Sequence, residues 1–281
     1  MTVQDLKIGN KVREPLSGLI FQIAAQEHPG YPGTVLVCDT VLKERPFDGK
    51  EAEGTPDQKK YGNNYFPESN LCMWLNSDKM ADWYQPGHAK DAPPSAENVY
   101  DHHASYEADR GFLAALSIPF QEALVVSQVP CTRAQAGGPS TLTTASMKVT
   151  LPGLWEIGYA TGKETVEGSL MPLFKDIRNR LAAPDASAFG VSDRWYFHRG
   201  ANYWYWLRTP ADGTDCLSWH TQHGLGYGMN AGEYPCYGHT GVRPMMAIRY
   251  DTAVSEKPDE FGIYTLFGGV KMPYKFDWIG G

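Results

Sequence analysis

The sequence predicts an α+β fold built from short strands, short helices and long loops. The 281 residues include 29 glycines and 20 prolines, and 12% of them are aromatic, which indicates many turns and short elements rather than long helices. A compact β-branched run, TVLVCDTV at residues 34–41, is typical of a well-buried strand. We therefore expect a central strand there, in a chain long enough to bury a substantial core.

The first elements can be predicted from apolar spacing and turn residues. Residues 8–23 alternate apolar positions around Pro15 and Gly18, which predicts two short strands joined by a turn. Residues 50–64 are charged and contain glycine and proline, so we expect a surface loop. Ser69 then precedes apolar positions spaced i, i+3, i+4 and predicts a helix start. The apolar face of that helix consists of Leu71, Trp74 and Leu75.

The middle of the chain predicts two loops around a helical segment. Residues 85–108 are polar, and their histidines lack metal-ligand spacing, so solvated loop histidines are expected. Residues 111–126 carry an apolar residue every four positions, interrupted by Pro119, which predicts two short helices meeting at a kink. Residues 132–146 are small and polar, and predict a flexible excursion between two strands. We expect one domain over residues 1–250, with insertions, rather than two.

The net charge and the distribution of apolar residues argue against nucleic acid as a partner and against insertion into a membrane. The net charge of −7 and the pI near 5.6 disfavour nucleic acid, because phosphate binding needs clustered Lys and Arg. The N-terminal MTVQDLKIGNKV has no apolar core of a signal peptide, and no stretch approaches the roughly 18 apolar residues that span a bilayer. We therefore expect synthesis in the cytoplasm, without a signal peptide and without membrane insertion.

Five cysteines are scattered along the chain without CxxC spacing, so at least one is unpaired in a monomer. Buried or surface thiols of a reducing cytosol are favoured. The sequence alone does not decide between a disulfide linking Cys216 and Cys236 and two free thiols.

The segment 201–240 reads as a displayed binding surface. It has eight aromatic residues, six glycines, three histidines and no lysine, and it runs into the apolar phrase GVRPMMAIRY. Stiff Tyr and Trp side chains among adaptable Gly, Ser, Asn and Asp are the composition of evolved paratopes. Trp204, Trp206 and Leu207 are instead expected in the core. The candidate ligand-binding residues are Asp215, Ser218, Trp219, His220, His223, Tyr227, Asn230, Tyr234, Tyr237 and His239.

A series of phrases carries a resemblance to a known family. YGNNYFPESNLCMWLNSD, HAKDAPPS, ADRGFL, LPGLWEIG, EGSLMPLF, YWYWLRTP and GVRPMMAI follow in an order that resembles a domain family of gut bacteria and their phages, over residues 8–250. The ending, an aromatic-WLR phrase, a glycine-rich stretch and GVRP, is similar to the C-type lectin fold. Phage tropism determinants, variable proteins of diversity-generating retroelements and formylglycine-generating enzymes share that fold.

The resemblance implies a C-type lectin-like fold and a non-enzymatic ligand-binding function. Residues 206–208 and 241–244 would be framework strands, with residues 212–239 displayed between them. It implies a phage receptor-binding or adhesin-type protein with a diversified surface, carried on a virion tail or a cell surface. The partner would be a bacterial surface protein or glycan, and a homo-oligomer or a virion partner is also implied. The residues 251–281 would form an extension that packs on the domain or on a neighbouring subunit.

Two rival functions follow from the same residues. A structural virion or surface-assembly protein would use the aromatic segment as a subunit interface, because interfaces share this composition. An oxidase like the formylglycine-generating enzymes would need close, activated cysteines, whereas Cys216 and Cys236 are far apart in sequence. The HTQH motif with His239 is a weak metal pattern, and neither a GxSxG elbow nor a phosphate-binding loop occurs. We therefore expect no catalytic residues, no metal and no cofactor.

Overall fold

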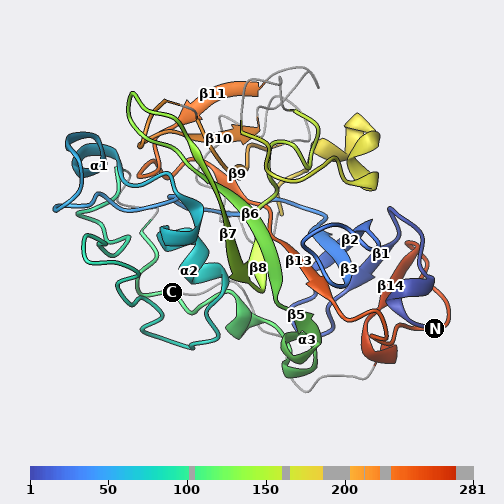
Figure 1. The fold of residues 1–281 in the computed structure, drawn as a ribbon. Coiled ribbons are helices and arrows are strands. Elements are labelled where there is room, and N and C mark those ends of the chain that lie inside the picture. Colours follow the sequence, from blue (N-terminus) through green and yellow to red (C-terminus); the bar gives the residue numbers. More distant parts are fainter. Residues whose placement is uncertain (101–104, 160–164, 186–202, 212, 222–228, 270–281) are drawn as a thin grey trace.

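The computed structural model describes the chain outside residues 101–104, 160–164, 186–202, 212, 222–228 and 270–281 (Figure 1). The fold is α+β, made mostly of strands with a few short helices, which confirms the predicted class at this level. The strands are β1 (Lys11–Arg13), β2 (Ile20–Ala25), β3 (Thr34–Cys38), β4 (Leu42–Glu44), β5 (Leu124–Val125), β6 (Ser127–Arg133), β7 (Thr141–Met147), β8 (Val149–Thr150), β9 (Trp206–Pro210), β10 (Ser218–Thr221), β11 (Met229–Glu233), β12 (Gly241–Val242), β13 (Met245–Ile248) and β14 (Ile263–Thr265). The α-helices are α1 (Pro56–Tyr61), α2 (Asn70–Leu75) and α3 (Ile118–Ala123).

The largest sheet has the strand order β14-β1-β2-β3-β13-β5, and β8 also pairs with β13. Its neighbouring strands are antiparallel except for β1 and β14, and the sheet curls into a half-barrel. The strand β3 lies between β2 and β13, and all five of its residues are buried. A strand that is covered on both faces in this way consists mainly of apolar residues, as β3 does. This placement confirms the central strand predicted from TVLVCDTV, and the two strands predicted in residues 8–23 are β1 and β2.

Both predicted helical segments are present. The side chain of Ser69 accepts a hydrogen bond from the Cys72 amide and caps α2, whose three predicted apolar residues are buried. Residues 111–126 form a single 3-10 turn (Leu113–Ala115) and then α3. Pro119 lies in the first turn of α3, where its missing N–H costs nothing, so it begins the second helix rather than kinking a longer one.

The prediction of a surface loop at residues 50–64 is wrong, because this segment contains α1 and buried residues. Thr55 and Gln58 form a reciprocal capping box in which each side chain accepts a hydrogen bond from the other's backbone N–H. The Thr-Pro-Asp-Gln sequence is the pattern of such a box with proline in the first turn. Asn63 and Asn64, just after the helix, are buried.

The excursion predicted at residues 132–146 is also wrong, because β6 and β7 pair as a long hairpin. Seven consecutive residues of each strand are in register, from Ser127 opposite Met147 to Arg133 opposite Thr141. The β7 strand is mostly exposed and rich in threonine, a β-branched residue that suits a half-exposed strand. Its small polar residues had suggested a loop.

The strand β9 is fixed by a buried charged centre. Arg208 is fully buried, and its guanidinium Nη1 donates to Glu156 Oε2 at 2.6 Å and to the Leu151 carbonyl at 2.9 Å. The hydroxyl of Tyr31 donates to the other oxygen of Glu156 at 2.8 Å. A second buried carboxylate, Glu167, accepts from the hydroxyl of Thr209. Such a network tolerates few rearrangements, so β9 provides a rigid support for the segment that follows.

The C-terminal residues extend the large sheet. The strand β14 pairs in parallel with β1, from Lys11 opposite Ile263 to Arg13 opposite Thr265. Arg13 also donates to Asp259 at 3.0 Å. Within the described residues, no helix is both long and apolar enough to cross a membrane.

Candidate functional site

The predicted binding segment is built on the three-stranded sheet β11-β10-β9, at the top of Figure 1. The expected core residues Trp206 and Leu207 are fully buried, while Trp204 is half-buried. The framework phrases of residues 206–208 and 241–244 lie in or beside strands β9, β12 and β13, as expected. Leu207, Val242, Met246 and Ile248, which lie in these strands, are all fully buried and form part of the core.

Three of the candidate binding residues, Asp215, Ser218 and His220, are buried, and the last two lie on β10. Ser218 is fully buried and His220 is 4% exposed. The imidazole of His220 lies 5.3 Å from the Trp204 ring and 6.3 Å, edge-on, from that of Trp206. Burial lowers the pKa of His220, so the ring is neutral near pH 7. Alternation along β10 directs these residues inward and makes them supports of the surface rather than contacts for a ligand.

The remaining candidates divide into three groups. His223 and Tyr227 lie outside the described residues, and Asn230 is described only by its backbone pairing with His220. Trp219 and His239 are half-buried. Tyr234 and Tyr237 are partly exposed.

Four tyrosines from distant parts of the chain meet beside this sheet, and we call Tyr61, Tyr100, Tyr234 and Tyr237 the tyrosine platform. The rings of Tyr61 and Tyr234 stack with centroids 3.7 Å apart and planes 11° apart. Tyr237 lies edge-on to Tyr234 at 5.4 Å and tilted against Tyr100 at 4.5 Å. Tyr100 is 62% exposed. The platform therefore offers a row of aromatic faces and edges at the surface.

Backbone hydrogen bonds fix the three segments of the platform to one another at Cys236. The amide of Cys236 donates to the carbonyl of Tyr61 at 2.9 Å, and the amide of Tyr100 donates to the carbonyl of Cys236 at 2.9 Å. The amide of Tyr237 donates to the carbonyl of Tyr234 at 2.9 Å and closes a tight turn. These main-chain bonds fix the positions of the segments that carry the rings, so the platform is pre-organised.

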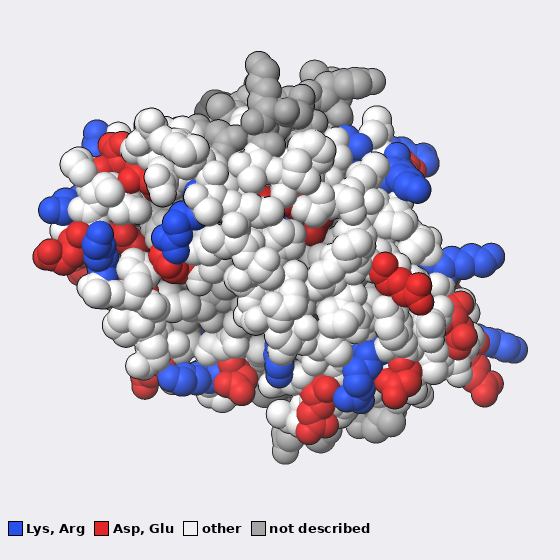
Figure 2. All heavy atoms as spheres, in the orientation of Figure 1, with Lys and Arg blue, Asp and Glu red and all other residues white. Residues whose placement is uncertain are grey.

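Two of the phenols in the platform have raised pKa values. A hydrogen bond with Tyr61 raises the pKa of Tyr234, and burial raises the pKa of Tyr237, so both phenols stay protonated. The ammonium of Lys60 lies 4.7 Å from the centroid of the Tyr61 ring, close enough for a cation–π contact. Figure 2 shows Lys and Arg interspersed with Asp and Glu around the rim of one face of the molecule. Contacts in the platform are thus dominated by ring stacking and neutral hydrogen bonds.

Sequence reasoning missed half of the platform. Tyr61 lies in the segment predicted as a charged surface loop, and Tyr100 in the polar loop of residues 85–108. The capping box at Thr55 would have placed Tyr61 at the end of a helix, but nothing in the spacing connects it to Tyr234. Their contact depends on tertiary folding alone.

A group of buried carboxylates lies in the neighbouring segments. Asp48 accepts from the backbone amides of Asn63 and Asn70, at 2.8 and 2.9 Å, and is fully buried. Burial raises the pKa of Glu51 to about 7, with a further contribution from Asp91. Burial likewise raises the pKa of Asp48 and of Asp91. Asp48 thereby connects the segment after α1 to the start of α2.

Replacing Glu51 with glutamine should make the protein less sensitive to rising pH. The folded pKa of about 7 lies above the unfolded value near 4.5, so the favourable contribution of the protonated carboxyl is present below pH 4.5 and is lost as pH rises through 7. Glutamine imitates the neutral carboxyl. Relative to the native protein, Glu51→Gln should therefore gain about 1–2 kcal/mol of unfolding free energy between pH 5 and pH 8, as measured by urea unfolding.

The matched control for this change is Glu53→Gln, because Glu53 is an exposed carboxylate in the same segment. It should leave the pH profile of stability unchanged. Parallel profiles for native protein and Glu51→Gln would show that the Glu51 carboxyl ionises as readily in the folded state as in the unfolded chain.

The cysteines are buried thiols. All five are free, so Cys216 and Cys236 form no disulfide. Burial raises the pKa of Cys38 and Cys72 to about 12 and that of Cys236 to about 11, and it also raises the pKa of Cys131 and Cys216. An unliganded thiol with a raised pKa is a poor nucleophile at neutral pH.

A comparison with known families gives one match. The family described as "Domain of unknown function (DUF6273)" matches residues 32–250, which include β3 to β13 and the segments that carry all four tyrosines of the platform. The strands β1, β2 and β14 lie outside the matched residues. No curated protein and no solved structure matches the chain. Since the match covers well over half of its residues, the chain belongs to the DUF6273 domain family.

Proposed function

We propose that this protein is a non-enzymatic recognition protein that binds its ligand through the tyrosine platform. The observation that carries the proposal is the packing of four tyrosines from three chain segments into one rigid surface cluster. Aromatic clusters in the core of a domain are enclosed by other side chains, whereas Tyr100 is 62% exposed and Tyr234 and Tyr237 are partly exposed. A fixed aromatic surface binds with little loss of conformational entropy.

The ligand of this proposal is a bacterial surface glycan or protein. Aromatic faces stack on sugar rings, and tyrosines also anchor protein interfaces, so both partners match a neutral row of phenols. Trp219 and His239, which are half-buried residues of the same sequence segment, are further candidate contacts. A single platform with few charges binds modestly, so display in several copies on a virion tail or a cell surface would supply avidity.

The sharper form of the proposal is a C-type lectin-like receptor-binding or adhesin protein with a retroelement-diversified surface. It rests on the resemblance of the WLR and GVRP phrases, which lie in or beside strands with buried Arg208 and Arg243. A framework anchored in this way tolerates changes between its strands. Sequencing the encoding locus tests this form: it requires a template repeat nearly identical to the DNA for residues 201–240 beside a reverse transcriptase gene, and a locus without them contradicts it.

Removing platform rings should abolish binding without unfolding the protein. Arrays of bacterial surface glycans and surface extracts are screened with the protein in monomeric and multimerised form. For a ligand identified in the screen, Tyr234→Ser and Tyr237→Ser should each weaken affinity at least tenfold. This corresponds to a loss of about 1.4 kcal/mol of binding free energy. The unfolding free energy should fall by only about 1 kcal/mol, since each change removes ring contacts at a partly exposed position.

The control is Phe261→Ser, which removes a 75% exposed aromatic side chain near β14, far in sequence from the platform. It should leave affinity unchanged. A ligand whose binding survives both tyrosine changes would contradict the proposed surface.

The second candidate is a structural role in which the platform is a subunit interface. Its composition is that of an interface hot spot, which is the observation in favour. Light scattering separates the two functions: the interface requires a stable oligomer that Tyr100→Ser and Tyr237→Ser dissociate, while the recognition function requires no such change in mass.

A further inference from the structure

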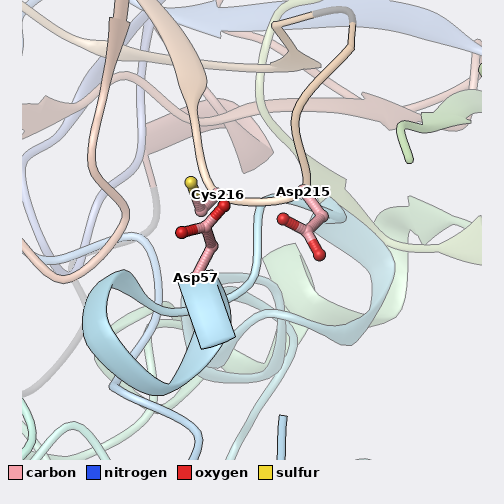
Figure 3. A group of neighbouring side chains, drawn as sticks. All are labelled: Asp57, Asp215 and Cys216. Carbon is pink, nitrogen blue, oxygen red and sulfur yellow. The ribbon is translucent and has the colours of Figure 1, made fainter. Parts of the chain in front are cut away.

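Two carboxylates and a thiol converge between α1 and the loop that leads into β10. Asp57 extends from α1 toward the adjacent residues Asp215 and Cys216, as Figure 3 shows. One ligand atom from each of the three side chains lies within 4.8 Å of the other two. Asp57 is exposed, while Asp215 and Cys216 are buried, so the group opens to solvent on one side only.

The carboxylate of Asp215 has an oxygen that is not satisfied by the protein. Its Oδ2 accepts a hydrogen bond from the Thr55 hydroxyl at 2.8 Å. Its Oδ1 is buried and has no hydrogen-bond partner among the described residues, although only 8% of the residue is exposed. An unpartnered carboxylate oxygen away from water is costly, and a bound cation removes that cost.

The electrostatics of the group also call for a positive charge. In the described part of the chain, no Lys, Arg or His side chain forms an ion pair with Asp57 or Asp215. A bound divalent cation would neutralise the two carboxylates and bind the Cys216 sulfur as a thiolate.

The donor atoms select the kind of metal. Calcium and magnesium prefer sites made only of oxygen, whereas a thiolate beside carboxylates suits a borderline-soft ion such as Zn²⁺. Bond lengths of about 2.0–2.3 Å put the donors of a tetrahedral zinc ion about 3.5 Å apart. Rotation of the exposed Asp57 side chain would bring its carboxylate closer to the other two donors. Three protein ligands leave the fourth position for water or another donor.

We propose that Asp57, Asp215 and Cys216 form a binding site for a single Zn²⁺-class divalent ion, with one coordination position open. The site adjoins the tyrosine platform, because Asp57 and Tyr61 are four residues apart and share one face of α1. From sequence spacing alone, the histidines of HTQH would be the candidate metal ligands. Asp57 and Asp215 are far apart in the chain, so no spacing pattern connects them. The site stands on its own geometry and does not depend on the recognition function.

Cobalt binding provides the direct test. The full chain is stripped with a chelator, and Co²⁺ is then titrated at pH 7.5 with absorbance as the readout, followed by Zn²⁺ competition. We expect one equivalent of metal and a near-ultraviolet charge-transfer band, which reports a bond between cobalt and a thiolate. Cys216→Ser should remove the band, and Asp215→Asn should weaken binding at least tenfold. Circular dichroism verifies that each variant is folded.

The matched controls are Cys236→Ser and Glu53→Gln, which change a second buried thiol and a second carboxylate of the same region. Both should keep the band and the affinity. Failure of the folded native protein to bind one equivalent, or a band that persists in Cys216→Ser, would overturn the site.

Discussion

Replacing Arg208 with alanine should remove a large part of the stability of the protein. The guanidinium is fully buried, forms a 2.6 Å ion pair with Glu156 and lies 4.0 Å from Glu167, which is also fully buried. Alanine would leave both carboxylates without a cation and the carbonyls of Pro130 and Leu151 without their donor. Breaking a buried pair in this way costs about 3–5 kcal/mol, out of a typical total of about 5–15 kcal/mol.

The effect of Arg208→Ala should also depend on pH in a definite direction. Burial already raises the pKa of Glu167, and removal of the cation would raise it further. Protonation then neutralises the buried carboxyl, so the variant should lose less stability at pH 5 than at pH 8. Urea unfolding at both pH values measures this difference.

Arg178→Ala is the matched control for Arg208. Arg178 pairs with Asp176 at 2.6 Å, but its side chain is 86% exposed. Exposed ion pairs contribute little, so this change should leave the unfolding free energy nearly unchanged. If Arg208→Ala behaved like the control, the buried centre would contribute nothing to the anchoring of β9.

The sequence predicted the framework of this protein better than its surface. The WLR and GVRP phrases were expected in strands because they resemble the framework of a known fold, and they lie in or beside β9, β12 and β13. The reason for their arginines could not be seen. Arg208 contacts Glu156, and Arg243 donates to the carbonyls of Cys38 and Asn179, so both roles depend on residues distant in the chain.

The errors in the predicted secondary structure have local causes. The hairpin of β6 and β7 was taken for a loop because its threonines and serines are polar, although β-branched threonine suits an exposed strand. The helix α1 was missed because the charge of its segment outweighed a visible capping box at Thr55. The β-branched threonines and the capping box are both visible in the sequence.

The candidate site was predictable only in its C-terminal half. Tyr234 and Tyr237 stood out by composition, but their partners Tyr61 and Tyr100 belong to segments that carry no aromatic pattern of their own. Ser218 and His220 were placed on the surface because their side chains are polar. The alternation of β10 and the packing of His220 against Trp204 put them inside.

Replacing Trp206 with alanine should be nearly as damaging as the loss of Arg208. The side chain is fully buried, its indole N–H donates to the Arg45 carbonyl at 2.8 Å, and its ring lies 5.6 Å from that of Phe47. Truncation would open a cavity and leave the carbonyl without this donor. Changes of this kind cost about 3–5 kcal/mol, measured as a shift of the urea midpoint with an unchanged slope.

Trp206→Phe separates the two contributions, because phenylalanine keeps most of the ring contact with Phe47 and removes only the indole donor. We expect it to cost about 1–3 kcal/mol, clearly less than alanine. The comparison with Tyr237→Ser then distinguishes framework residues from platform residues. Tyr237→Ser should weaken ligand binding and leave the unfolding free energy nearly unchanged. A mild effect of Trp206→Ala would mean that β9 is not the support on which the platform depends. Equal losses of stability for Trp206→Ala and Tyr237→Ser would place the tyrosines in the core.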